Sequence, residues 1–161
     1  ELYFGQKTKY FTGKIPREYI LENGALLVVM TDLTSDMIIL GNTIILSSSD
    51  TVLHNQRIGK IGYNDQIFDL NFLNLLMNAS YVKKYVKLTA TGTTVRHTSP
   101  SKIMEQTVPL PTLSEQKKIA CAISKIQDSI SDNQRKLFQT QSLKKSLMQD
   151  LLTGKVRVQV N

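Results

Sequence analysis

Two short polar stretches of this 161-residue chain carry side chains suited to reading nucleic acid. The first, Leu53–Arg57, places His54, Asn55, Gln56 and Arg57 in succession. Asparagine and glutamine pair bidentately with adenine, and arginine pairs with guanine, in the major groove of DNA. An ordinary surface turn often has the same composition, so both interpretations stay open from these residues alone.

The second stretch is Thr91–His97, with the sequence TGTTVRH. Its small hydroxyl donors, its flexible glycine and its arginine suit a loop that holds phosphates or base edges. A solvated surface loop has a similar composition, and this alternative also stays open.

Residues for catalysis, or for binding a metal or a cofactor, form no recognisable pattern. The only histidines, His54 and His97, lie far apart with no cysteine nearby, whereas metal ligands are closely spaced. No glycine-rich loop of the nucleotide-hydrolase or dinucleotide-binding type occurs. Ser47–Asp50 lacks the GxSxG turn of a nucleophilic serine. We therefore expect no enzyme activity, no metal and no cofactor.

The elements that position these stretches begin with strands. The apolar run Ala25–Met30 predicts a buried strand. Residues 37–40 and 43–47 flank Gly41-Asn42, which predicts a hairpin turn. Residues 56–63 predict a strand that bends, because glycines interrupt its alternating pattern.

Helices follow these strands. Asp69 is expected to cap one helix and Ser80 another. Ser99 followed by Pro100, as cap and first helical residue, predicts one short turn before Val108. The lysines of the second helix fall off its apolar stripe and are expected to be solvated: Lys83, Lys84 and Lys87. Strands early in the chain and helices late in it predict an α+β fold.

A long helix is predicted for the last third of the chain. Thr112 and Glu115 have the spacing of a capping box, in which the two side chains satisfy each other's backbone N–H groups. About forty residues follow without glycine or proline until Gly154, which suits the left-handed position just past a helix end. A helix of about 38 residues is roughly 57 Å long. A domain of this size cannot cover that length, so we expect a partner-binding arm.

An apolar seam on this helix predicts pairing with another helix. Its members recur at alternating steps of four and three residues, as in a coiled coil: Ile119, Ile123, Ile126, Ile130, Asn133 and Leu137. Asn133 either forms a buried hydrogen bond that sets the register of the pair or lies in a solvated part of the seam. After Leu137 the pattern shifts to Leu143, Leu147 and Leu151, which predicts a different contact surface.

The chain is basic, with a formal net charge of +7. Residues 1–111 hold eleven Lys and Arg against nine Asp and Glu, a net charge of +2, and residues 112–161 hold nine against four, a net charge of +5. A basic chain suits a polyanion such as nucleic acid, although a basic helix face is also commonly solvated surface. The lone Cys121 fits a reducing cytoplasm, and no apolar run is long enough to span a membrane.

Four segments of the chain share a pattern with one known family. They are LHNQRIGKI at 53–61, ATGTTVRHTSPSKI at 90–103, VPLPTLSEQKKIA at 108–120 and LLTGKVRV at 151–158. Together they resemble the specificity subunit of type I restriction-modification systems. The resemblance covers most of the chain and is strongest from Ala90 onward.

The resemblance implies a non-catalytic reader of double-stranded DNA sequence without a cofactor. In this family, methylation subunits supply the S-adenosylmethionine chemistry, and motor subunits supply ATP-driven translocation and cleavage. By the same resemblance, residues 1–111 form a target recognition domain that is incomplete at its N-terminus. Residues 112–154 form a long dimerisation and spacer helix, and residues 155–161 form a C-terminal tail.

A complete family member has two recognition domains and two long helices, whereas this chain has one of each and resembles a half subunit or a fragment. Two copies are therefore expected to form a homodimer through antiparallel helices, which places two identical domains on a bipartite DNA target. The DNA-facing residues under this interpretation are His54, Asn55, Gln56, Arg57, Lys60, Thr91, Gly92, Thr93, Thr94 and Arg96. Arg57 could equally form a salt bridge, and Asn55 and Gln56 could cap strands.

The rival interpretation is a structural or interaction protein, in which the coiled-coil helix joins an assembly and the globular part binds another protein. The basic helix and Asn133 suit this class equally well. DNA affinity and its salt dependence discriminate between the two, because counterion release makes DNA binding fall steeply as salt rises.

Overall fold

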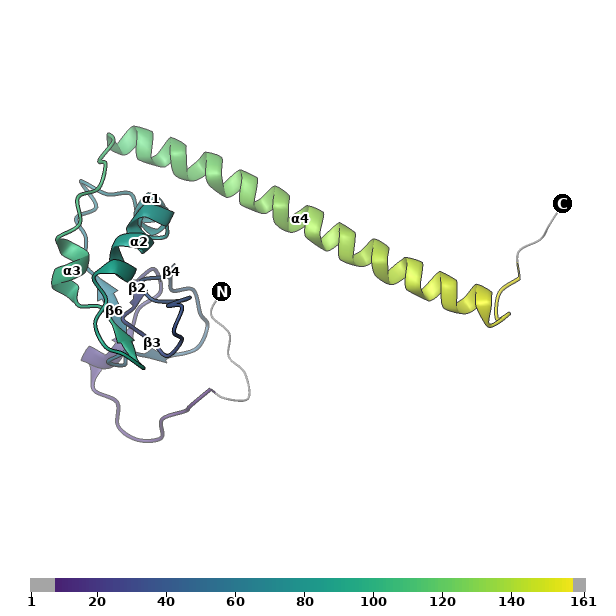
Figure 1. Ribbon diagram of the computed structural model, residues 1–161, viewed down its shortest axis with the longest axis horizontal. Helices are drawn as coiled ribbons and strands as arrows, with labels where there is room; N and C mark the ends of the chain where they lie inside the picture. The colour runs from purple at the N-terminus through teal and green to yellow at the C-terminus, as the bar shows by residue number, and fades with distance from the viewer. Residues whose placement is uncertain (1–7, 158–161) are drawn as a thin grey trace. The chain divides into compact units, whose positions relative to one another are not determined.

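A computed structural model describes residues 8–157, with strands and helices mixed along the chain (Figure 1). The chain divides into two compact units, the first ending at Ala120 and the second beginning at Cys121. Short antiparallel strands and short helices belong to the first unit, and the second contains most of one long helix. The α+β class predicted from the sequence is confirmed.

The centre of the first unit is an antiparallel sheet in which β2 (Leu26–Val29) lies between β4 (Thr43–Ile45) and β6 (Ile58–Ile61). Successive side chains of a strand point to opposite faces, and here Leu26 and Leu27 belong to two separate buried clusters. Because both faces are covered, β2 is apolar at every position instead of alternating. The buried strand predicted from the apolar run is confirmed.

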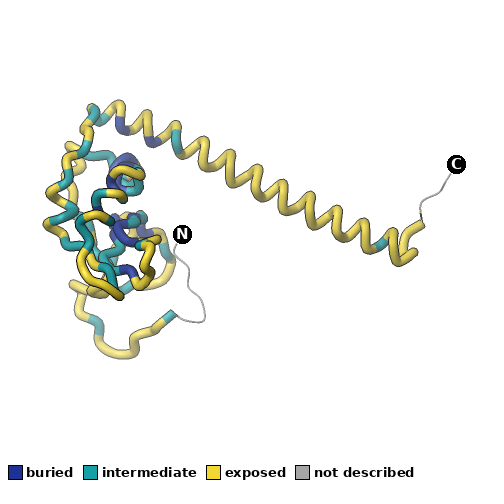
Figure 2. The backbone as a smooth tube through the Cα atoms, in the orientation of Figure 1, coloured by how far each residue is buried: buried dark blue, intermediate teal, exposed yellow. Residues whose placement is uncertain are grey.

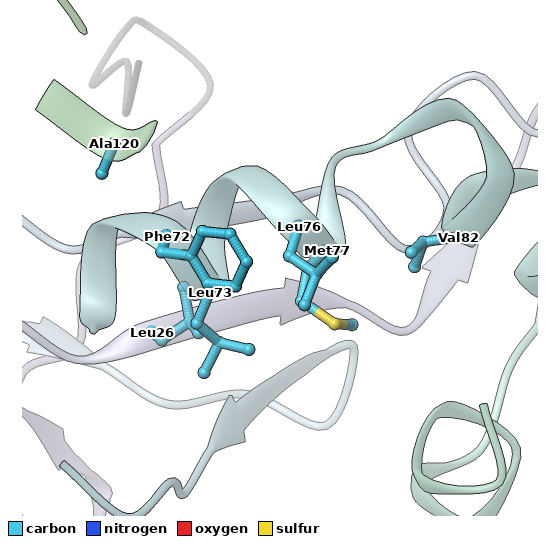
Figure 3. Packing of buried hydrophobic residues seen from close by; sticks show 7 residues of the cluster. All are labelled: Leu26, Phe72, Leu73, Leu76, Met77, Val82 and Ala120. Atoms are coloured by element: carbon cyan, nitrogen blue, oxygen red, sulfur yellow. The ribbon is translucent and has the colours of Figure 1, made fainter. Parts of the chain in front are cut away.

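Two helices pack on the Leu26 face of this sheet. Helix α1 (Leu70–Met77) begins as predicted at Asp69, whose side chain accepts a hydrogen bond from the Phe72 N–H group at 3.0 Å. Helix α2 (Ser80–Leu88) follows directly. Sheet and helices share one cluster of buried side chains (Figure 3), which comprises Leu26, Phe72, Leu73, Leu76, Met77, Val82 and Ala120.

The predicted cap of α2 is wrong. Ser80 is the first residue of the helix, and Ala79 is its N-cap without a side-chain hydrogen bond. The cause is the short connection between the two helices. The C-cap of α1 is Asn78, whose side-chain amide donates to the Thr43 carbonyl oxygen at 2.9 Å. Only Ala79 then takes an extended conformation before the next helix starts.

Residues 33–40 form a loop (loop 33–40) around the buried carboxylate of Asp32, so the predicted hairpin strand at 37–40 is wrong. The carboxylate accepts hydrogen bonds of 2.7–3.1 Å from three backbone N–H groups, those of Thr34, Ile39 and Leu40. A buried charge must be satisfied in this way. N–H groups that point at the carboxylate cannot also pair in a strand ladder, so this segment loops.

Very short strands complete the first unit. They pair antiparallel as β1 (Ile20–Leu21) with β5 (Val52–Leu53), and β3 (Thr31–Asp32) with β7 (Arg96–His97). A two-residue strand carries no periodic pattern, so the sequence did not predict these pairs. A 3-10 turn, η1 (Arg17–Tyr19), precedes β1. Helix α3 (Pro100–Met104) begins as predicted, with the Ser99 side chain accepting a hydrogen bond from Lys102 N–H at 3.3 Å.

The long helix, α4 (Leu113–Leu152), has 40 residues and begins at the predicted capping box. The Glu115 carboxylate accepts from the Thr112 N–H group at 2.9 Å, and the Thr112 hydroxyl accepts from the Glu115 N–H group at 3.4 Å. The hydrogen bonds from Thr112 lower the pKa of Glu115. Gly154, at φ +72°, follows the helix end as expected. Neither α4 nor any other helix among residues 8–157 is long and apolar enough to cross a membrane.

Gln116 fastens the start of α4 to the first unit. Its side chain is fully buried, and its Oε1 accepts from the Asp69 N–H group at 2.8 Å. Its Nε2 donates to the carbonyl oxygens of Ile67 and Pro111, both at 2.9 Å. These three bonds offset the cost of burying the amide. Because Gln116 belongs to the interior of the first unit, the boundary between the units falls within α4 and not at its start.

Replacing Gln116 with leucine keeps the side chain's size but removes all three hydrogen bonds. The Asp69 N–H group and two carbonyl oxygens then lose their partners, and we expect the free energy of unfolding to fall by about 1–3 kcal/mol. Urea denaturation followed by circular dichroism measures the change. Gln139→Leu, at an exposed position of the same helix, is the matched control. An equal loss in both variants would contradict the role assigned to Gln116.

Candidate nucleic-acid interface

The two polar stretches singled out in the sequence meet at one surface hollow of about 280 Å³ in the first unit. We call it the β3 hollow, and its lining residues are Thr31, Leu33, Gln56, Arg57, Val95 and His97. The first stretch contributes Gln56 and Arg57, and the second contributes Val95 and His97. Tertiary structure therefore unites two segments that are distant in the sequence.

Strand β3 and the residue before it hold the two stretches together. The Met30 N–H group donates to the Arg57 carbonyl oxygen at 2.8 Å, and the Met30 carbonyl oxygen accepts from the Thr98 N–H group at 3.0 Å. Strand β3 then pairs with β7, and the Thr31 hydroxyl lies 3.0 Å from His97 Nδ1. This short backbone segment fixes the position of one stretch relative to the other.

A tight turn presents the first stretch. The Asn55 side-chain oxygen accepts from the Arg57 N–H group at 2.8 Å, and the Asn55 carbonyl oxygen accepts from the Ile58 N–H group at 3.1 Å. Gln56 and Arg57 are exposed at this turn. Within residues 8–157, none of the ion pairs involves Arg57. Asn55 thus serves the turn itself, while the side chains of Gln56 and Arg57 face solvent.

Two residues predicted together with this stretch, His54 and Lys60, do not line the β3 hollow. His54 is half-buried, and its Nε2 has no hydrogen-bond partner in the described part of the chain. Lys60 is exposed on β6 and borders a second hollow of about 420 Å³ that also includes Glu22 and Tyr63. In the same described residues, no cluster of His, Cys, Asp and Glu side chains could hold a metal ion.

The second stretch folds into a closed loop. Thr91 and His97 exchange two backbone hydrogen bonds, both of 2.9 Å. Gly92 has a φ of +93°, and a Cβ atom there would come within 2.0 Å of the Val95 carbonyl oxygen. Only glycine fits such a position without displacing the backbone, so Gly92 shapes the loop.

The arginines of the two stretches differ in their surroundings. Arg96 is half-buried and donates from Nη1 to the Gly92 carbonyl oxygen at 2.6 Å, so its guanidinium closes the loop. Arg57 is exposed beside the β3 hollow. At the tip of the closed loop, Thr93 and Thr94 are exposed. The sequence could not rank the two arginines, because their contacts depend on the fold.

Thr31 and Leu33 line the β3 hollow, and sequence reasoning missed both. Leu33 is 63% exposed although it follows directly after the buried Asp32. Asp32 and Thr34 form an Asx turn, since the Thr34 N–H group donates to the aspartate side chain at 2.8 Å. An aspartate two residues before a threonine, just after a buried strand, was the signal that could have located this edge.

Asp32 is the electrostatic anchor of loop 33–40. Burial by itself raises the pKa of its carboxyl group, but the hydrogen bonds from Thr34, Ile39 and Leu40 outweigh burial and hold the pKa below its ordinary value of 3.8. The group is therefore a carboxylate at neutral pH. Its charge keeps the N–H groups of the loop directed inward, which fixes Leu33 at the edge of the β3 hollow.

The predicted pairing seam of α4 lies at the surface of the single chain (Figure 2). The side chains of Ile126, Ile130 and Leu137 are 60%, 51% and 58% exposed. Ile119 and Asn133 are also exposed, whereas Ile123 is half-buried. Large apolar side chains that recur along an exposed helix mark an interaction surface.

The chain is similar to specificity subunits of type I restriction enzymes. The model of a family described as "Type I restriction modification DNA specificity domain" matches residues 4–139. The type I restriction enzyme MjaVIII specificity subunit of Methanocaldococcus jannaschii is 32% identical over 103 residues, which cover 64% of this chain and 24% of that protein. The MjaX specificity subunit of the same organism is 34% identical over 79 residues, 49% of this chain and 19% of that protein. The chain thus spans about a quarter or less of the length of these relatives.

Asp32→Asn tests the anchor of loop 33–40. The amide nitrogen would face backbone N–H groups, so we expect the free energy of unfolding at neutral pH to fall by about 1–3 kcal/mol. Because the folded state lowers the pKa of Asp32, the wild-type advantage is fully present above the ordinary pKa of 3.8 and is lost as the pH falls through the lower folded-state value.

Urea denaturation of both proteins between neutral and acidic pH measures this advantage. Asp36→Asn, which changes an exposed aspartate of the same loop, is the matched control. If the wild-type advantage over Asp32→Asn grew on acidification, the assignment of a lowered pKa to Asp32 would be wrong.

Proposed function

Because the chain belongs to the family of type I restriction modification DNA specificity domains, we propose that it recognises a base sequence in double-stranded DNA. The observation that carries the proposal is the β3 hollow, where two distant polar stretches meet and Gln56 and Arg57 are exposed. The family match also favours this function over the rival class of structural or interaction protein.

Arg57 and Gln56 are the residues that we assign to base edges. An arginine fork pairs with O6 and N7 of guanine, and a glutamine amide pairs with N6 and N7 of adenine. Within the described residues, no ion pair competes for Arg57. Thr93, Thr94 and His97 of the second stretch are assigned to phosphates or further base edges.

Other members of the predicted DNA-facing set support the site in this proposal. Asn55 holds the turn that presents Gln56 and Arg57, and Gly92 and Arg96 close the second loop. Thr91 pairs with His97 at the base of that loop, and the His54 N–H group, just before the turn, donates to the Tyr19 carbonyl oxygen. The exposed Lys60 stays a prediction for a backbone phosphate contact outside the β3 hollow.

The proposed setting is a type I restriction-modification complex, since both relatives are named as specificity subunits of type I restriction enzymes. In this setting the chain docks with methylation and motor subunits, which carry out the chemistry, and works without a cofactor of its own in the cytoplasm. In such a complex the chain reads the DNA sequence and the other subunits carry out catalysis, so the chain needs rigid recognition loops and not an active site.

We also propose that two copies pair through antiparallel α4 helices. The exposed seam from Ile119 to Leu137 supports this pairing. Asn133 would then form a buried hydrogen bond that sets the register. A twofold-related pair presents two identical β3 hollows, which matches a bipartite DNA target with inverted half-sites.

Arg57→Ala is the direct test of base reading. We expect it to weaken binding to a preferred duplex, selected from a random library, by about 1–3 kcal/mol and to relax specificity at one position. Arg135→Ala, which removes an exposed arginine of α4, is the control and should leave both unchanged. Fluorescence anisotropy with and without a methylation subunit measures binding. An equal loss on every duplex would make Arg57 a phosphate contact, and no DNA binding by the wild type in either setting would refute the proposed function.

The pairing of α4 is tested by placing charge in its seam. We expect the wild type to be a dimer and the double variant Ile126→Asp/Ile130→Asp to be a monomer at about tens of micromolar, because apolar seam positions do not tolerate carboxylates. Light scattering after size-exclusion chromatography measures the masses. Ser124→Asp/Ser131→Asp adds the same charge outside the seam and should stay dimeric. A monomeric wild type would rule out self-pairing.

A further inference from the structure

A second surface of the first unit lies on α2, away from the proposed base contacts. It borders a hollow of about 510 Å³, which we call the α2 hollow. Three lysines line it together with aliphatic side chains and one hydroxyl: Met37, Ile38, Ser80, Lys83, Lys84, Lys87 and Leu88. None of these side chains belongs to either of the two buried clusters.

The three lysines share one side of α2. Lys87 is four residues from Lys83 and three from Lys84, and both spacings bring side chains together on a helix. Val82 and Val86 of the same helix are buried in the core. The helix contains no acidic residue, and none of the ion pairs in the described part of the chain involves these lysines. Among the described residues, no carboxylate therefore neutralises their positive charge.

The α2 hollow also supplies an apolar surface for the lysine stems. Ile38 and Leu88 are 63% and 75% exposed, whereas Lys83 and Lys87 are half-buried. Lysine side chains cover apolar surface with their stems and keep the ammonium group in water. Lys87 Nζ donates to the Asp36 carbonyl oxygen at 3.0 Å, so this lysine is held against loop 33–40.

Loop 33–40 connects the α2 hollow to the β3 hollow. It contributes Leu33 to the β3 hollow and both Met37 and Ile38 to the α2 hollow. The Asp32 carboxylate holds the loop from inside, as described above. Just after the loop, Gly41 approaches α2 so closely that a Cβ atom would lie 2.9 Å from Val86 Cγ1. The loop is thus fixed at both ends, and the two hollows keep a defined relation.

We propose that Lys83, Lys84 and Lys87 bind phosphate groups of the DNA backbone that flanks the bases at the β3 hollow. This inference rests on the proposed function and assigns the phosphate contacts that accompany base reading. Phosphate oxygens accept charge-assisted hydrogen bonds from ammonium groups, and such contacts position a protein on DNA without reading sequence. Asp36 is the one exposed carboxylate of loop 33–40, so the cations remain in excess.

The test is the salt dependence of DNA binding by the full chain with Lys83→Gln, Lys84→Gln and Lys87→Gln combined. Each phosphate contact contributes about 0.9 to the slope of log affinity against log salt, so we expect the slope to become smaller by about two to three. Affinity should fall by roughly tenfold or more at physiological salt, on a selected and an unrelated duplex alike. Fluorescence anisotropy over a salt series, with the methylation subunit present, gives both quantities.

Two controls separate this contact from a general effect of charge. Lys117→Gln/Lys118→Gln/Lys125→Gln removes three exposed lysines from α4 and should leave the slope close to that of the wild type. Asp36→Asn removes the carboxylate beside the α2 hollow and should tighten binding to both duplexes. Circular dichroism and thermal melting confirm that each variant is folded.

Each outcome supports or overturns the proposal. If the wild type binds DNA and the α2 variant keeps its affinity and slope, the phosphate contact is wrong, and the lysine and aliphatic surface fits an acidic protein partner instead. A loss confined to the selected duplex would also overturn it, since phosphate contacts do not discriminate sequence. A wild-type chain that binds no DNA would refute the proposed function and this inference together.

Discussion

The arrangement of the candidate site depends on the requirement that the buried carboxylate of Asp32 be satisfied. A charge in the interior is costly unless hydrogen bonds surround it, and here the donors are backbone N–H groups of the residues that follow. The same residue belongs to β3, which pairs with β7 at the base of the second polar stretch. One carboxylate therefore shapes loop 33–40 and anchors the strand that joins the two stretches. Because the loop contributes Leu33 to the β3 hollow and Met37 and Ile38 to the α2 hollow, the geometry of both hollows depends on this carboxylate.

Gln116, at the start of α4, is also a buried polar group that needs hydrogen-bond partners, but its side chain is neutral. Its amide has both donor and acceptor capacity, and each is used by the backbone of the first unit. Beyond Ala120 no residue of the helix is buried, and the seam residues Ile126, Ile130 and Leu137 are exposed. The two parts thus differ physically. Buried polar groups with hydrogen-bond partners fix the shape of the first unit, whereas the helix beyond it carries exposed apolar side chains.

The charged residues are also distributed unevenly along the chain. Residues 112–161 hold most of the net positive charge. Arg57 and the lysines of α2, which lie beside loops with a fixed shape, belong instead to residues 1–111. Net charge attracts a polyanion from a distance, but recognition requires donors held at defined positions. Residues 1–111, with a net charge of only +2, are therefore the better candidate for reading sequence.

Local signals in the sequence determined the strand β2, the caps at Asp69 and Ser99, and both ends of α4, because each signal acts between residues within a few positions of one another. The failures depend on which polar side chains the fold buries and bonds. The loop at residues 37–40 was decided by the burial of Asp32, whose carboxylate bonds to N–H groups only two to eight residues further along the chain. The cap of α2 was decided by Asn78, whose side chain bonds to Thr43, 35 residues away. The meeting of Thr31 with His97, 66 residues apart, likewise has no local signature. The residue types of the candidate site were therefore readable from the sequence, but only tertiary contacts decided that Arg57 faces solvent, that Arg96 closes its own loop and that Lys60 lies at another hollow.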